Sequence, residues 1–254
     1  MYFTVLVVSL AVALFLGLLA AQEIGRRLGV RHRQLARMAV AEGGVVDGAV
    51  FALLGLLIAF TFSGAAARFE ERSKLTAEEA NDIGTAYLRL NLLPADAQPD
   101  LRDTFRRYLD SRLAFYSVLP DIDRAKAELA VSSKLQNEIW VKSIAAATGS
   151  QPATMLLLPS LNDMFDIVTT RTAAALRHPP EIIFVMLCAL ALFGGVLAGY
   201  AVAGKERSWV HTMLFALTLS GAVYVILDLE YPRLGFVRLD RADRVLVELR
   251  ESMN

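Results

Sequence analysis

The sequence is poor in the residues and motifs that chemistry usually requires. Its 254 residues include one cysteine, Cys188, which excludes a disulfide within the chain and a cluster of thiolate metal ligands. Its three histidines lie far apart and show no metal-ligand spacing. No phosphate-binding or dinucleotide-binding glycine motif occurs, and no nucleophile elbow does. We therefore predict no enzyme activity, no cofactor and no metal site.

An excess of charge of either sign is also lacking. The chain has 26 basic and 26 acidic residues, and this balance argues against a nucleic-acid partner, which requires a basic face. Long apolar runs, in contrast, are present. Each is close to the roughly 20 residues that a helix needs to cross a bilayer, and none has an ionisable residue at its centre. They cover roughly residues 2–21, 45–65, 181–203 and 208–228.

These runs predict an all-α integral membrane protein with two helices, an insert and two more helices, whose first partner is the lipid bilayer. The first run has no Lys or Arg before it, and its apolar segment is too long for a signal peptide. We therefore interpret it as a retained helix. The five-residue connection GKERS makes the last two helices antiparallel neighbours. The predicted domains are 1–65 with a basic linker at 22–44, an insert at 66–180, the second helix pair at 181–228 and a tail at 229–254.

The insert has the periodicity of helices. Apolar residues recur at steps of three and four, as in Leu101, Phe105 and Leu109, and no segment alternates like a strand. Prolines separate the periodic stretches, which predict a four-helix bundle. Its helices are expected at 66–93, 100–118, 121–147 and 153–177.

One stretch changes from membrane to aqueous composition without a helix-breaking signal. Residues 53–81 contain no proline and only two glycines, so we predict one helix over 45–93, about 70 Å long if straight. Four residues at the transition are candidates for a pore or gate, because an apolar ring can close a channel by dewetting. The alternative is packing or interfacial aromatics. The four are Phe60, Thr61, Phe62 and Ser63.

Small residues form stripes at helical spacing in two of the membrane runs. Such stripes let membrane helices approach closely, either in ordinary packing or about a symmetric axis of a homo-oligomer. They comprise Gly48, Ala52, Gly55 and Ala59 in the second run, and Gly195 and Gly199 in the third.

Charged residues follow the last membrane run. Asp228, Glu230 and Arg233 fit either an interfacial salt bridge or a ring of charge that attracts ions in an oligomer. Pro232 ends the helix, and the apolar spacing after it predicts a short amphipathic helix on the bundle or on the membrane surface.

The sequence resembles the bacterial bestrophin-like membrane proteins in five blocks that span nearly the whole chain. This resemblance implies an ion channel in a bacterial inner membrane, a pentamer around a central pore lined by the second helix, and inorganic ions as its cargo. It places Phe60, Phe62 and Ser63 near the neck of the pore. The calcium-binding acidic cluster of animal bestrophins has no match here. The blocks are LLGLLIAFTFSGAAARFEERSKL, EEANDIGTAYLRLNLLP, RRYLDSRLAFY, LNDMFDIVTTRTAAALRH and VYVILDLEYPRLGFVRLD.

Orientation and function stay open between stated alternatives. The arginines of the 22–44 linker place the short loops in the cytoplasm and the insert outside, whereas the resemblance implies a cytoplasmic insert. The favoured function is a channel or channel-like conduit. The rivals are a non-conducting scaffold or sensor whose insert binds a partner, and a membrane enzyme. For the enzyme the first residues to inspect are Asp163, Asp166 and Arg171.

Overall fold

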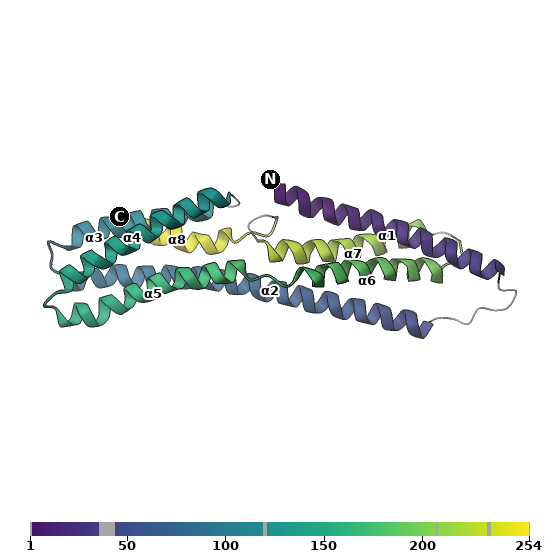
Figure 1. The fold of residues 1–254 in the computed structure, drawn as a ribbon, viewed down its shortest axis with the longest axis horizontal. Helices are drawn as coiled ribbons and strands as arrows, with labels where there is room; N and C mark the ends of the chain where they lie inside the picture. The colour runs from purple at the N-terminus through teal and green to yellow at the C-terminus, as the bar shows by residue number, and fades with distance from the viewer. Residues whose placement is uncertain (1, 36–43, 119–120, 207, 233–234, 254) are drawn as a thin grey trace. The chain divides into compact units, whose positions relative to one another are not determined.

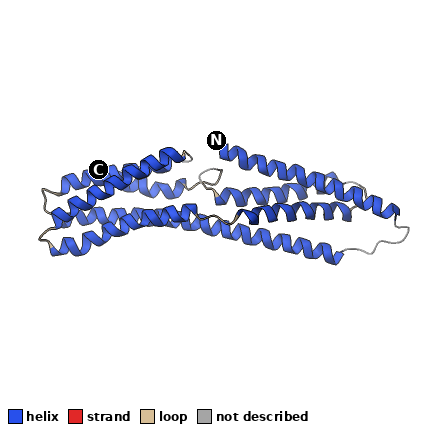
Figure 2. Cartoon of the chain, viewed as in Figure 1, coloured by secondary structure: helices blue, strands red, loops and turns tan. Residues whose placement is uncertain are grey.

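The computed structural model describes residues 2–35, 44–118, 121–206, 208–232 and 235–253. Within these ranges all regular structure is helical, as Figure 2 shows, so the predicted all-α class is confirmed. The helices, labelled in Figure 1, are α1 (Tyr2–Leu35), α2 (Gly44–Arg89), the short 3-10 helix η1 (Leu90–Leu92), α3 (Gln98–Ser117), α4 (Ile122–Ala147), α5 (Gln151–Leu176), α6 (Glu181–Ala201), α7 (Trp209–Glu230) and α8 (Asp240–Ser252).

The chain divides into two compact units. The first, here called the membrane unit, comprises Met1–Arg68 and His178–Val237. The second, here called the bundle unit, comprises Phe69–Arg177 and Arg238–Asn254. Among the residues that the structure describes, four helices are long and apolar enough to cross a membrane, and they contain α1, α2, α6 and α7. The protein is therefore a multi-pass membrane protein with a helical insert, as its sequence predicts.

Helix α1 organises the membrane unit. It packs along both α6 and α7, and these two helices also contact each other, less extensively than either contacts α1. Leu18 of α1, Leu187 of α6 and Ala216 of α7 are fully buried in the shared core.

The crossing of α1 and α6 brings backbone against backbone. A Cβ atom placed on Gly199 would lie 1.9 Å from the carbonyl oxygen of Gln22, and one on Gly25 would lie 1.9 Å from that of Val196. Gly29 similarly faces Ala203. Such closeness needs residues without side chains, which is the usual basis of tight packing between membrane helices.

The predicted linker at 22–44 is wrong over its first part. Helix α1 continues to Leu35, and it carries Arg26, Arg27, Arg31 and Arg33 on helix rather than loop. Its last turns are held by local pairs of Glu23 with Arg26 and Arg27. Arg37 lies outside the described residues.

Helix α2 is unbroken across the boundary between the two units. It runs from Gly44 to Arg89 and is followed directly by η1, which confirms the single helix predicted over 45–93. In a bilayer this continuity has a physical reason, because backbone groups in hydrocarbon find hydrogen-bond partners only within the helix.

The core of the bundle unit is apolar and joins five helices. Ile83 of α2, Phe105 of α3, Ile139 of α4 and Leu161 of α5 are fully buried together. Side-chain caps begin two of these helices. Asp121 accepts a hydrogen bond from the backbone of Arg124 at α4, and Ser150 accepts one from Ala153 at α5.

Helix α8 completes the bundle unit and shows where the predicted amphipathic tail helix packs. Its Leu246 is fully buried, and the guanidinium group of Arg250 lies 2.7 Å from the carboxylate of Asp110 on α3. Tyr87 and Arg106 both donate to the carbonyl oxygen of Met253. Helix α8 therefore belongs to the bundle unit, whereas the part of the tail up to Val237 belongs to the membrane unit.

A buried ion cluster lies inside the bundle unit. The side chain of Glu79 on α2 has no exposed surface and accepts hydrogen bonds from Arg112 of α3 and Arg171 of α5. The hydroxyl of Tyr116 donates to Glu79 at 3.1 Å, and Arg171 donates to Thr76 at 2.8 Å. One carboxylate thus joins three helices.

We predict that Glu79→Ala destabilises the protein strongly. Removing the shared carboxylate leaves two buried guanidinium groups without their partner, which costs about 3–5 kcal/mol. The check is the apparent melting temperature of the detergent-solubilised protein. Glu78→Ala, one position away and exposed, is the matched control and should melt like wild type. Equal melting temperatures for the two variants would contradict the assignment.

Candidate pore-lining helix

The membrane half of α2 has one buried face. Leu54 and Ala65 are buried and lie within about 20° of each other around the helix axis, since each residue advances about 100°. Leu54 and Phe51 contact the position of Gly194 on α6, and Phe51 meets Phe215 of α7 edge to face, with ring centroids 6.2 Å apart. This face fixes α2 on its own membrane unit.

The remainder of this half of α2 is exposed in the single chain. In its most apolar window only 6% is buried, compared with 28% in each of the other three candidate spans. One exposed face carries large residues, namely Leu53, Leu56 and Phe60. A second exposed face carries the small-residue stripe Gly48, Ala52, Gly55 and Ala59. Two chemically different surfaces of one helix are therefore left for lipid or for other chains.

The four pore candidates do not share a face. Phe60 is 67% exposed and Phe62 is 45% exposed, but two residues correspond to about 200° around a helix, so their side chains point in nearly opposite directions. The hydroxyl of Thr61 donates back to the carbonyl oxygens of Leu57 and Ile58 at 2.7 and 3.0 Å. Ser63 is exposed.

The two small-residue stripes differ in their surroundings. A Cβ atom on Gly48 or Gly55 would meet nothing within 4 Å, so that stripe has no neighbour within the described part of the chain. Gly195 and Gly199, in contrast, pack directly against α1 at Ala21 and Gln22. Only the stripe on α2 is left for contact with another molecule.

Between Phe62 and the bundle unit, an ion pair of Arg68 with Glu230 holds α2 to α7. The guanidinium group of Arg68 makes a bidentate contact with the carboxylate of Glu230. Nη2 donates to Oε2 at 2.6 Å, and Nε donates to Oε1 at 3.1 Å. The side chain of Glu230 is fully buried. Nδ1 of His178 lies 2.9 Å from the same carboxylate, and the ring of His178 stacks on Tyr231.

Asp228 performs a different task at the same end of α7. Its two carboxylate oxygens accept hydrogen bonds from the backbone amides of Phe236 and Val237, both at 2.9 Å. A Cβ atom on Gly235 would lie 1.4 Å from this carboxylate, so the turn needs glycine. Within the single chain, both predicted membrane-exit carboxylates are therefore used by the fold. Arg233 lies outside the described residues.

The model of the Bestrophin-like domain matches residues 12–243. The chain belongs to the Bestrophin-like family. The match covers α1 to the start of α8, and thus both the membrane unit and nearly all of the bundle unit.

Solved structures show the same fold for this Bestrophin-like chain. A bacterial Bestrophin homolog from Klebsiella pneumoniae matches with a TM-score of 0.68 and 14% identity, over 94% of this chain and 98% of that one. One single-residue variant of that homolog matches with a TM-score of 0.70 and 14% identity, over 94% and 98%. A second variant matches with a TM-score of 0.67 and 16% identity, over 96% and 98%. Among curated proteins none matches this chain.

The residues considered for a membrane enzyme do not converge in this Bestrophin-like chain. Arg171 is buried on Glu79, whereas Asp163 and Asp166 are exposed on α5. Burial raises the pKa of Asp82, and the charges of Asp163 and Glu78 raise it further, so acidic groups gather near this position. Within the described ranges, no three His, Cys, Asp or Glu side chains are arranged to hold a metal ion.

Sequence reasoning identified Glu230 but missed Arg68 and His178 as partners of its carboxylate. Arg68 is 162 residues away in sequence, and no local pattern links the two. A usable signal was present, because an arginine directly after an apolar run needs a counter-charge when the helix continues without a break.

We predict that Glu230→Gln weakens the membrane unit. The variant leaves Arg68 without its counter-charge, and because that side chain is a quarter exposed we expect the lower end of about 3–5 kcal/mol. Loss of stability is followed as the apparent melting temperature in detergent micelles. The exposed Glu181→Gln is the control and should not change it. A wild-type melting temperature for Glu230→Gln would show that the pair does not fix α2.

Proposed function

We propose that this Bestrophin-like protein assembles as a homo-oligomer about a central axis and conducts inorganic ions through a pore lined by α2. The observation that carries the proposal is the exposure of α2, whose most apolar 18-residue stretch is only 6% buried in its own chain. Its small-residue stripe is suited to close contact with a second copy, because lipid gives no drive to bury large side chains there. The family resemblance alone suggests five copies.

Helix geometry indicates which residues would face the axis. The direction opposite buried Leu54 and Ala65 is occupied by Leu56 and Ser63, each within about 10°. Phe60 lies about 50° from that direction and Phe62 about 110° from it. If the buried face of α2 points away from the axis, Phe60 projects toward the pore, and Phe62 lies beside the stripe that packs against the neighbouring copy.

The mechanism needs no covalent chemistry. In the oligomer, each subunit contributes its Leu56 and Phe60 to an apolar constriction. When this constriction is narrow it excludes water, and an ion cannot cross the dry segment without losing its hydration shell. Ser63 then offers a hydroxyl just beyond the constriction. Helix α2 continues beyond this segment, and the contact of Arg68 with Glu230 holds it to α7 within the membrane unit.

We predict that Phe60→Ala raises ion flux through proteoliposomes several-fold, because a smaller side chain wets the constriction. Phe62→Ala is the matched control, with the same change two positions along α2. Phe62→Ala should leave the ion flux per assembled oligomer close to that of wild type. It should instead weaken assembly, and the fraction of assembled oligomer is measured by cross-linking.

Two other results would contradict this assignment. Increased flux with Phe62→Ala but not with Phe60→Ala would reverse the orientation of α2. An absence of flux in wild type and in both variants, with assembly intact, would favour the non-conducting scaffold whose bundle binds a partner.

A further inference from the structure

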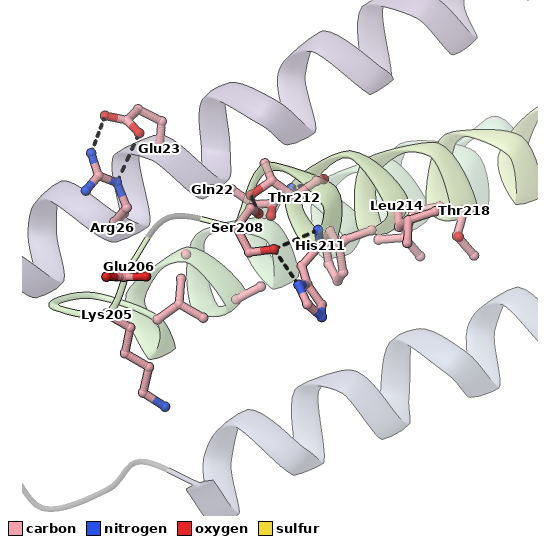
Figure 3. Close-up of a pocket in the computed structure, with 15 residues that line it drawn as sticks. Gln22, Glu23, Arg26, Lys205, Glu206, Ser208, His211, Thr212, Leu214 and Thr218 are labelled. Atoms are coloured by element: carbon pink, nitrogen blue, oxygen red, sulfur yellow. Dashed lines mark hydrogen bonds and ion pairs between the residues drawn. The ribbon is translucent and has the colours of Figure 1, made fainter.

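A pocket of about 710 Å³ lies in the membrane unit, next to the connection between α6 and α7 (Figure 3). Its volume is within the range of sites that bind small molecules, about 300–1,000 Å³. Helices α1, α6 and α7 all contribute to its lining, together with Lys205 and Glu206 from the connection. Neither the pore residues nor the Arg68–Glu230 pair belong to it.

The lining of this pocket changes from polar to apolar along α7. Glu23, Arg26, Lys205 and Ser208 lie at the end near the connection, and Leu214, Phe215 and Leu219 lie further along. The lining from Ser208 to Leu219 extends about 16 Å along the helix. A ligand that fills it must therefore be polar at one end and apolar at the other.

The change from polar to apolar lining matches the depth of the pocket in the membrane. Helices α6 and α7 are both spans, and the connection between them lies where the chain leaves the bilayer. The polar end is therefore level with the headgroups and the apolar end reaches into the hydrocarbon. A lipid molecule likewise has its polar headgroup at the membrane surface and its apolar chains in the hydrocarbon.

The polar end of the pocket carries charged groups of both signs, which suit the charged headgroup of a phospholipid. Nε of Arg26 lies 3.3 Å from the carboxylate of Glu23, and Nε of Arg27 lies 2.8 Å from it, so one carboxylate serves two guanidinium groups. Lys205 and Glu206 add one charge of each sign. Arg27 does not line the pocket, so its lining carries two cationic side chains, Arg26 and Lys205, beside two anionic ones, Glu23 and Glu206.

We propose that this pocket binds one glycerophospholipid of the surrounding bilayer, with its phosphate at Arg26 and an acyl chain along the apolar part of α7. The site does not depend on conduction by the protein. A bound lipid would lie against α6 and α7, which contact each other less than either contacts α1.

The test uses the purified full-length protein and native mass spectrometry after extensive detergent washing, with dioleoylphosphatidylglycerol added back as the probe. Wild type should retain one phospholipid per chain. Thr218→Trp places a large side chain in the pocket and should abolish the retained lipid. Leu217→Trp, on the neighbouring exposed position outside the pocket, should retain it.

A second pair of variants tests the polar end. Arg26 and Arg27 both contact Glu23, but only Arg26 lines the pocket. Arg26→Gln should weaken binding of phosphatidylglycerol about tenfold, as expected for the loss of one charge-assisted contact. Arg27→Gln should leave binding close to wild type. This pair decides the question even if Thr218→Trp does not fold.

Glycerol 3-phosphate distinguishes a lipid from a soluble phosphate compound. The proposal predicts no retained adduct with it at millimolar concentration, because it lacks the acyl chain. The proposal is overturned if glycerol 3-phosphate binds as well as the lipid, or if Thr218→Trp and Leu217→Trp retain equal amounts. Equal affinities of the Arg26 and Arg27 variants would also overturn it.

Discussion

The structure depends on the backbone hydrogen bonds of α2, which continue without interruption from Gly44 to Arg89. In hydrocarbon a broken ladder would leave amide and carbonyl groups without partners, at a cost of several kcal/mol each. In water the same break would cost little. The absence of proline between Leu53 and Asn81 is thus essential for helix stability only in the membrane half. Because proline is also absent from the aqueous half, one helix is common to both units.

Two arginines one turn apart fix α2 at the boundary. Arg68 pairs with Glu230 inside the membrane unit, whereas Arg72 donates to the carbonyl oxygens of Ala174 and Arg177 at the end of α5, inside the bundle unit. Arg72 thereby satisfies carbonyl groups that a helix end leaves without intrahelical partners. Further along, Glu79 joins α2 to α3 and α5. The aqueous half of α2 is held by these polar contacts together with the apolar core around Ile83, and the membrane half relies mainly on one apolar face.

The sequence predicted what depends on local composition and periodicity. Four spans, a helical insert and an unbroken second helix follow from apolar runs, helical spacing and missing prolines. It did not predict that α1 reaches Leu35, because arginines after an apolar run were interpreted as a loop, although a helix accommodates them as well. It also missed the partners of Glu79 and Glu230, since contacts over 33 to 162 residues are set by tertiary packing. The sequence proposed pore candidates on α2 but not the directions of their side chains, which follow from the buried face of that helix.

The most direct test of this account is a distance measured across the boundary of α2. Spin labels at Leu53→Cys and Lys74→Cys, in a Cys188→Ala background diluted with unlabelled protein, probe the helix within one chain by pulsed electron paramagnetic resonance. A continuous helix predicts one narrow distribution near 32 Å for the 21-residue separation. A broad distribution, or one centred well below that distance, would show that α2 breaks at the membrane edge and would contradict the account.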